Sequence, residues 1–214
     1  MTRISNSLDA RDVATRYLHE FRQLLAQVDV DALARIVGLL KLARDDGATI
    51  YIAGNGGSAA TASHWANDLG KATKSAGRGW IRAMCLSDNT PWLTALANDE
   101  GYERVFAGQL ENFASPDDVL IVISASGNSP NLVQAVELAN ERGLATIAFL
   151  GFDGGILKER VHEYLWLPTP HGAYGLAESG HSVLCDIVTT CLMEDRAVAA
   201  RVPAAAPNDA RLAE

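Results

Sequence analysis

The sequence has few features that would tie it to a membrane, a nucleic acid or a disulfide framework. It contains no apolar run of about 18 residues and no apolar signal core near its start, so we expect neither a membrane span nor a secretory leader. Its three cysteines, Cys85, Cys185 and Cys191, are widely spaced and form no CxxC pair, which predicts buried thiols in a reducing compartment. The cytoplasm is therefore the expected location.

Basic residues are also scarce, and this argues against a nucleic-acid partner. The chain has 18 Lys and Arg against 26 Asp and Glu, and its net charge of −8 is opposite to that of a nucleic-acid-binding surface. A small anionic ligand stays possible, because a local anion site can oppose the global charge. We therefore expect a small-molecule partner, with no nucleic acid and no membrane.

What is present is typical of one globular domain with an extension. The chain has 214 residues, of which 48% are hydrophobic, enough to bury a core. Residues 1–47 are predicted to form two N-terminal helices, the second ending near Gly47, and their apolar stripes pack on the domain body or on another copy of the chain. Residues 48–200 form the main domain, and residues 201–214, rich in Ala and Pro, are predicted to be a flexible tail.

From residue 49 onward, short apolar runs alternate with amphipathic segments. The runs cover residues 50–53, 81–86, 119–124, 145–150 and 164–167, and the amphipathic segments lie near 58–73, 90–99, 102–114, 129–142 and 154–161, with a last helix over 174–199. This alternation predicts an α/β fold with a mostly parallel five-stranded sheet covered on both faces. In such sheets ligands bind outside the carboxyl ends of the strands.

The first candidate site follows the first predicted strand. Residues 54–58, Gly-Asn-Gly-Gly-Ser, form what we call the glycine turn, and a helix is predicted directly after it. Free backbone N–H groups and the helix dipole favour an anion at such a position. His64 and Asp68 lie four residues apart on one face of that helix, where they suit a metal or acid–base chemistry. An ordinary hydrogen-bonded His–Asp pair is the simpler alternative.

The second candidate site follows the strand over residues 119–124. Residues 124–129, Ser-Ala-Ser-Gly-Asn-Ser, form what we call the serine loop, which can bind a phosphate through hydroxyls and backbone amides. The simpler alternative is that Asn128 or Ser129 caps the helix that begins near Pro130. Neither loop is a Walker loop, and Ala59 replaces the third glycine of a dinucleotide fingerprint, so a dinucleotide ligand is disfavoured.

These motifs resemble those of a known family. GNGGSA, the His64–Asp68 pair, LSDN, ALANDEGYERVF and SASGNSPN are similar to the sugar isomerase (SIS) domain proteins, and within them to the phosphoheptose isomerase group, from about residue 10 to 195. The resemblance implies a three-layer αβα, flavodoxin-like fold and a homotetramer. It also implies conversion of D-sedoheptulose 7-phosphate to D-glycero-D-manno-heptose 7-phosphate through an enediol(ate), with a divalent metal, zinc in many members.

The resemblance also implies a role for individual residues. The sugar would contact Asn55, Gly56, Gly57, Ser58, Asn98 and Asp99, and the phosphate would contact Ser124, Ser126 and Ser129. The metal ligands would be His64, Asp68, Glu178 and Asp186. The catalytic residues would be His64, Asp68 and Glu178, with either carboxylate as the base. Without the resemblance, Asn98 and Asp99 are a helix end, and Glu178 is an acid favoured by the dipole of its helix.

One position departs from the family pattern. Asp186 stands where a metal-binding, acid-acting histidine is usual. His181 is not a simple replacement, because it and Asp186 point about 140° apart on an ideal helix, although it could approach the site of a neighbouring subunit. The departure favours one alternative, a non-catalytic SIS-type protein that binds a sugar phosphate or a protein partner, or regulates. An isomerase of another sugar phosphate is a further alternative, because the sequence does not set the chain length or stereochemistry of the sugar.

Overall fold

The computed structural model describes residues 9–74 and 79–200, the last five of them by their backbone only. Its centre is a sheet of five parallel strands in the order β2-β1-β3-β4-β5. The strands are β1 (Thr49–Gly54), β2 (Arg82–Cys85), β3 (Val119–Ser124), β4 (Ala145–Leu150) and β5 (Glu163–Trp166). The predicted parallel sheet is therefore confirmed, and every strand ends at the same edge.

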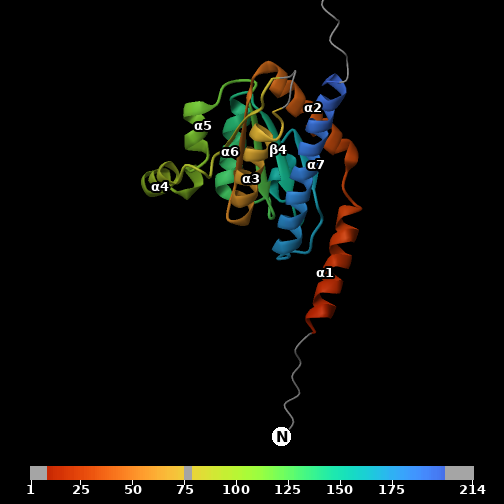
Figure 1. Ribbon diagram of the computed structural model, residues 1–214. Helices are drawn as coiled ribbons and strands as arrows, with labels where there is room; N and C mark the ends of the chain where they lie inside the picture. Colours follow the sequence, from red (N-terminus) through yellow and green to blue (C-terminus); the bar gives the residue numbers. More distant parts are fainter. Residues whose placement is uncertain (1–8, 75–78, 201–214) are drawn as a thin grey trace, which may run out of the picture.

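Helices cover both faces of this sheet, which gives the predicted three layers (Figure 1). One face packs against α2 (Val30–Asp46), α3 (Gly57–Lys71) and α7 (Tyr174–Ala200). The other face packs against α5 (Ala107–Phe113) and α6 (Pro130–Glu141), while α4 (Thr90–Asp99) stands to one side of the body. Short 3-10 turns, η1 (Tyr102–Arg104) and η2 (Ile156–Glu159), complete the second layer.

The central strand β3 shows why the apolar runs become strands. Val119, Ile121 and Ile123 join the core under α2, α3 and α7, and Leu120 and Val122 join the core under α5 and α6. Successive side chains of a strand point to opposite faces, so only a continuous apolar run suits a sheet that is covered on both sides. Each fully buried aliphatic side chain contributes about 1.5–3 kcal/mol to the free energy of folding.

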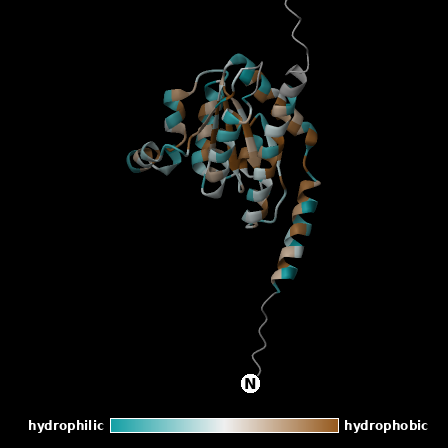
Figure 2. Ribbon diagram, viewed as in Figure 1, coloured by the Kyte–Doolittle hydropathy of each residue, from teal (hydrophilic) through white to brown (hydrophobic). Residues whose placement is uncertain are grey.

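The two N-terminal helices have different roles. Helix α2 belongs to the body, because Ile36 and Leu40 are fully buried in the core, and it ends at Gly47 as predicted. Helix α1 (Ala10–Leu25) projects from the body and buries only Leu24 (Figures 1 and 2). Its apolar residues Val13, Tyr17 and Leu18 are exposed.

Other expectations meet the structure with small differences. The segment predicted to be helical over residues 154–161 forms only the turn η2, because it starts with two glycines, which are poor helix formers. The predicted helix over residues 102–114 is divided into η1 and α5. The predicted tail, residues 201–214, lies outside the described residues.

All three cysteines are free, and Cys85 and Cys185 are buried. In the described part of the chain, no helix is both long and apolar enough to span a membrane.

Candidate functional site

A cavity of about 140 Å³ lies at the carboxyl edge of the sheet, where β1, β3 and α7 meet. Six of the residues predicted for the site line it: Asn55, Ser58, Ser124, Ser126, Ser129 and Glu178. They come from three segments, of which the first and the last are more than 100 residues apart in the sequence. Parallel strands bring the segments together because their carboxyl ends share one edge. The structure thus joins the glycine turn, the serine loop and the start of α7 in one place.

Glu178 stands directly over the start of α3. A Cβ added at Gly57 would lie 2.5 Å from Oε1 of Glu178 and 2.7 Å from its Oε2, so the carboxylate occupies the space that any side chain at position 57 would need. The residue before the helix, Gly56, offers no capping side chain. The carboxylate therefore meets the positive end of the α3 dipole, which stabilises a negative charge. Only glycine at position 57 allows this approach.

The serine loop presents hydroxyl groups whose oxygens already accept hydrogen bonds from backbone N–H groups. Oγ of Ser124 accepts a hydrogen bond from the Gly127 N–H at 3.0 Å, and Oγ of Ser126 accepts one from the Asn128 N–H at 3.3 Å. Each hydroxyl keeps its own proton to donate. Ser129 sits at the N-cap of α6, but its side chain makes no capping hydrogen bond. The hydroxyls are therefore available to a phosphate, and the capping alternative does not explain this loop.

A second loop, residues 151–157, fixes the backbone of the serine loop. The Leu157 N–H donates to the carbonyl of Gly127 at 3.0 Å, and the Ile156 N–H donates to Oδ1 of Asn128 at 2.9 Å. A side chain at Gly127 would collide with the carbonyl oxygen of Gly154. The phosphate-binding candidate is thus a rigid loop, which lowers the entropy cost of binding. Among the residues that the structure describes, no Lys or Arg lines the cavity, so an anion would be held by hydroxyls, N–H groups and helix dipoles.

Several contributors were not predicted from the sequence. Tyr174, the first residue of α7, lines the cavity. Asn131 exchanges two hydrogen bonds with the side chain of Asn55, and Tyr102 donates a third to it. Asn131 and Tyr102 stand inside the motifs SASGNSPN and ALANDEGYERVF, but only the tertiary structure brings them to Asn55.

The predicted metal ligands do not converge in the single chain. Nε2 of His64 lies 3.3 Å from Oδ2 of Asp68, with 67% and 25% of their side chains exposed. Glu178 faces Gly57, seven residues before His64, which is about 10 Å along the axis of α3. Within residues 9–74 and 79–195, no three His, Cys, Asp or Glu side chains are placed to hold one ion. The four-residue set stays a prediction.

Asp186 and His181 occupy different environments on α7. Asp186 is exposed. His181 is fully buried against the Leu150 backbone, and neither of its ring nitrogens makes a hydrogen bond of good geometry within the described residues. Burial lowers the pKa of His181 to about 4, opposed by the Leu150 backbone. The suggestion that His181 reaches the site of a neighbouring subunit is therefore wrong.

Asn98 and Asp99 lie outside the cavity lining. They are exposed at the end of α4, where Nδ2 of Asn98 donates to Oδ1 of Asp99 at 2.7 Å. Their sugar-binding role stays a prediction.

A larger cavity, of about 760 Å³, lies at the amino ends of the strands, near Asp118 and Gly47. Oδ1 of Asp118 accepts from the Thr49 N–H, which is a structural role, and that edge of a parallel sheet seldom binds ligands.

Comparisons with known proteins agree with the fold. The SIS domain model matches residues 16–151. The phosphoheptose isomerase of Geobacter metallireducens is 37% identical over 178 residues, covering 80% of this chain and 93% of that protein. The structure of the phosphoheptose isomerase of Neisseria gonorrhoeae is similar with a TM-score of 0.77 and 30% identity, covering 86% of this chain and 98% of that one. That of Francisella tularensis, at 23% identity, supports the fold with a TM-score of 0.79, covering 87% and 100%.

Proposed function

The chain belongs to the SIS domain family and, within it, to the phosphoheptose isomerases, and on this premise we propose that it converts D-sedoheptulose 7-phosphate to D-glycero-D-manno-heptose 7-phosphate. One observation carries the proposal. A carboxylate, Glu178, stands over a helix N-terminus in the same cavity as three serines of a rigid loop. A base beside an anion site is what the isomerisation of a sugar phosphate requires.

The phosphate binds in the serine loop. Ser124, Ser126 and Ser129 donate hydroxyl protons to its oxygens, and the N-terminus of α6 adds its dipole. The cavity, about 140 Å³, is smaller than the usual pocket for a whole small molecule. It holds the phosphate and the nearest carbons, and the rest of the sugar extends along the glycine turn, so that C1 and C2, the carbons farthest from the phosphate, lie at Glu178.

Glu178 is the base. Its carboxylate removes a proton from C1 of the ketose, which forms a C1=C2 enediolate, and returns the proton to C2, which gives the aldose. The second proton moves between the oxygens on C1 and C2. Donors directed at these oxygens, among them the Asn55 side chain and the start of α3, stabilise the negative charge of the enediolate. Asp68, the other candidate base, pairs with His64 outside the cavity lining.

A divalent metal, zinc, is part of the proposal but fits the chain only in part. His64 and Asp68 supply one nitrogen and one oxygen, which zinc accepts, but protein zinc sites use three or four protein ligands. A bound ion would polarise the substrate carbonyl and orient its two oxygens. Because Glu178 and Asp186 do not join the pair within the described part of one chain, the steps above assign the proton transfer between C1 and C2 to Glu178 and route no step through the ion.

A homotetramer in the cytoplasm completes the proposal. Val13, Tyr17 and Leu18 of α1, and Ile187 and Met193 of α7, are exposed large apolar residues, which a second copy would cover. The free cysteines suit a reducing compartment. Analytical ultracentrifugation of the full chain tests the assembly, and a sedimentation coefficient of a monomer would contradict it.

The function is tested by following sedoheptulose 7-phosphate into the aldose product with purified full chain and added divalent metal. Glu178→Gln should lower kcat about 100-fold or more, as expected for loss of a catalytic base, and Asp68→Asn should lower it less. Tight binding of sedoheptulose 7-phosphate without turnover would instead favour the non-catalytic alternative, which the aspartate at position 186 motivates. If the protein neither bound nor converted sedoheptulose 7-phosphate, a site for this sugar phosphate would be rejected.

A further inference from the structure

A reciprocal amide pair joins the glycine turn to the helix that follows the serine loop. Asn55 directly follows β1, and Asn131 is the second residue of α6, where it is 2% exposed. Nδ2 of Asn55 donates to Oδ1 of Asn131 at 3.0 Å, and Nδ2 of Asn131 donates back to Oδ1 of Asn55 at 2.8 Å. Two antiparallel hydrogen bonds fix the plane of both amides, so neither side chain can turn alone without losing both bonds.

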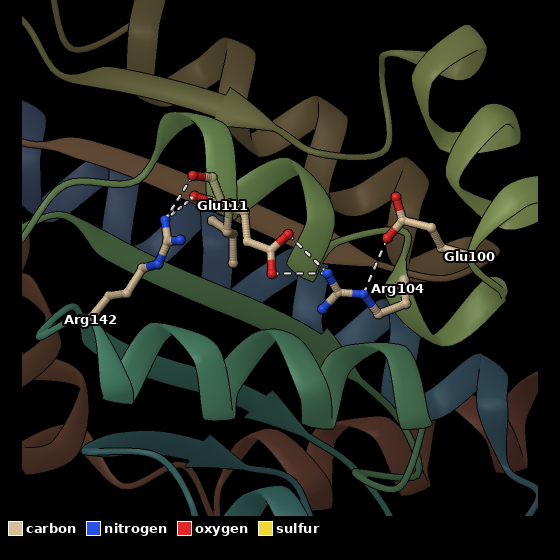
Figure 3. Close-up of polar contacts among 5 residues, drawn as sticks. Glu100, Arg104, Glu111 and Arg142 are labelled. Carbon is tan, nitrogen blue, oxygen red and sulfur yellow. Dashed lines mark hydrogen bonds and ion pairs between the residues drawn. The ribbon is translucent and has the colours of Figure 1, made fainter.

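Tyr102 adds a third hydrogen bond from the other side. Its hydroxyl donates to Oδ1 of Asn55 at 3.1 Å. The segment that carries Tyr102 is itself held, as Figure 3 shows: Arg104 makes two 2.9 Å hydrogen bonds to the carboxylate of Glu111, and Arg142 donates to the Glu111 carbonyl at 2.9 Å. Arg142 directly follows α6, so the same helix that carries Asn131 also holds the segment that places Tyr102.

Among the described residues, the hydrogen bonds of Asn55 leave one of its side-chain N–H groups without a partner. A carboxamide has two acceptor positions on its oxygen and two N–H donors. Oδ1 of Asn55 receives hydrogen bonds from Asn131 and Tyr102, and Nδ2 uses one N–H on Asn131. The remaining N–H belongs to a side chain that lines the cavity with Ser58 and Glu178. Asn55 therefore offers the cavity a donor, and its acceptor oxygen is turned away.

We propose that Asn131 is a positioning residue for the isomerisation, which acts through Asn55 by fixing which end of its amide faces the sugar. The inference rests on the proposed function. Without Asn131, the Asn55 amide can turn by half a rotation and present its oxygen to the substrate. An acceptor would then face the enediolate oxygens, where a donor is needed, and one such donor contributes about 100-fold or more to kcat.

A double-mutant cycle tests the inference. The proteins are the full-length wild type, Asn55→Ala, Asn131→Ala and the double variant, each assayed for kcat and KM with sedoheptulose 7-phosphate. We expect Asn131→Ala alone to lower kcat by about tenfold or more with a smaller change in KM, and to have no further effect when Asn55 is already alanine. Asn131→Leu, which keeps the side-chain volume, should behave like Asn131→Ala and serves if the smaller variant folds poorly. Tyr102→Phe should lower kcat by a smaller factor.

The matched control is Gln134→Ala, one turn further along α6 and outside the cavity lining, which should keep the wild-type kcat. Losses that multiply in the double variant would overturn the inference, because Asn131 would then act independently of Asn55. The inference would also be overturned if Asn131→Ala lowered the melting temperature and reduced kcat equally in the wild type and in Asn55→Ala. Calorimetric binding of sedoheptulose 7-phosphate to the same proteins separates the two claims: coupled binding losses without any turnover would reject the isomerase and keep the role of Asn131.

Discussion

The carboxylate of Glu178 packs directly against Gly57 and lies where a side chain at residue 57 would begin. A Cβ at Gly57 would be 2.6 Å from Cδ of Glu178 and 2.5 Å from its Oε1. The glycine turn therefore serves the site in a way that its motif does not reveal. Besides leaving backbone N–H groups free, it makes room for the proposed base.

Gly57→Ala should damage catalysis without damaging the fold. The methyl group displaces the Glu178 carboxylate, and a misplacement of about 1 Å can cost about 100-fold in rate, so we expect kcat/KM to fall about 10- to 100-fold. Gly70→Ala is the matched control on the same helix, since a Cβ there meets no atom within 4 Å. It should keep full activity and raise the free energy of unfolding by up to about 1 kcal/mol. Equal activity in the two variants would show that Glu178 is not the base.

The serine loop should control substrate affinity more than turnover. Ser124→Ala and Ser126→Ala each remove one hydroxyl donor to a charged phosphate, worth about 1.5–3 kcal/mol, which corresponds to a rise in KM of about 10- to 100-fold with little change in kcat. Inhibition by inorganic phosphate should weaken in parallel. Ser63→Ala, on α3 and outside this cavity, is the control. A fall in kcat at unchanged KM would place the phosphate elsewhere.

His181 should make the fold sensitive to mild acid. Its pKa is lowered by burial from 6.5 to about 4, so between these values the unfolded chain binds a proton that the folded chain does not. Stability is therefore fully present above pH 6.5 and falls as the pH drops toward 4. We expect the free energy of unfolding, measured with urea, to fall by about 2 kcal/mol between pH 7 and pH 5 from this group.

The variant His181→Leu isolates that contribution. It removes the titrating ring and retains an apolar side chain in the core, so the decrease between pH 7 and pH 5 should shrink by the same amount. His19, on the exposed part of α1, provides a control as His19→Leu, which should leave the pH dependence as it is in the wild type. An unchanged acid sensitivity in His181→Leu would mean that the buried ring is protonated in the folded protein.

Metal binding should depend on His64 and not on Asp186. His64 and Asp68 approach each other, whereas Asp186 is exposed on α7, and no third ligand joins the pair among the described residues. Zinc titration of the full chain should therefore show weaker affinity in His64→Ala, by about tenfold or more for loss of one of few ligands, and wild-type affinity in Asp186→Ala. An equal loss in Asp186→Ala would show that the ligands assemble as the family resemblance implies.

The order of strands and helices could be predicted from local chemistry. Continuous apolar runs such as residues 119–124 suit only a strand buried on both faces, and Gly47 ended a helix where its conformation allowed the turn. The glycine turn and the serine loop were also visible, because each combines a strand end, small residues and a helix start. Their shared location followed from the rule that parallel strands end at one edge.

What the sequence determined by itself is the set of elements and the two loops, because strand and helix patterns depend on neighbours a few residues apart. The tertiary structure decided which side chains meet. It placed Glu178 against Gly57, paired Asn55 with Asn131 and buried His181 in the core. It also separated Glu178 from His64 by two helix turns, although both stood in one predicted metal site. The placement of Glu178 depends on how α3 and α7 are aligned against each other, and the Asn55–Asn131 pair depends on how the end of β1 meets the start of α6. No local pattern encodes either arrangement.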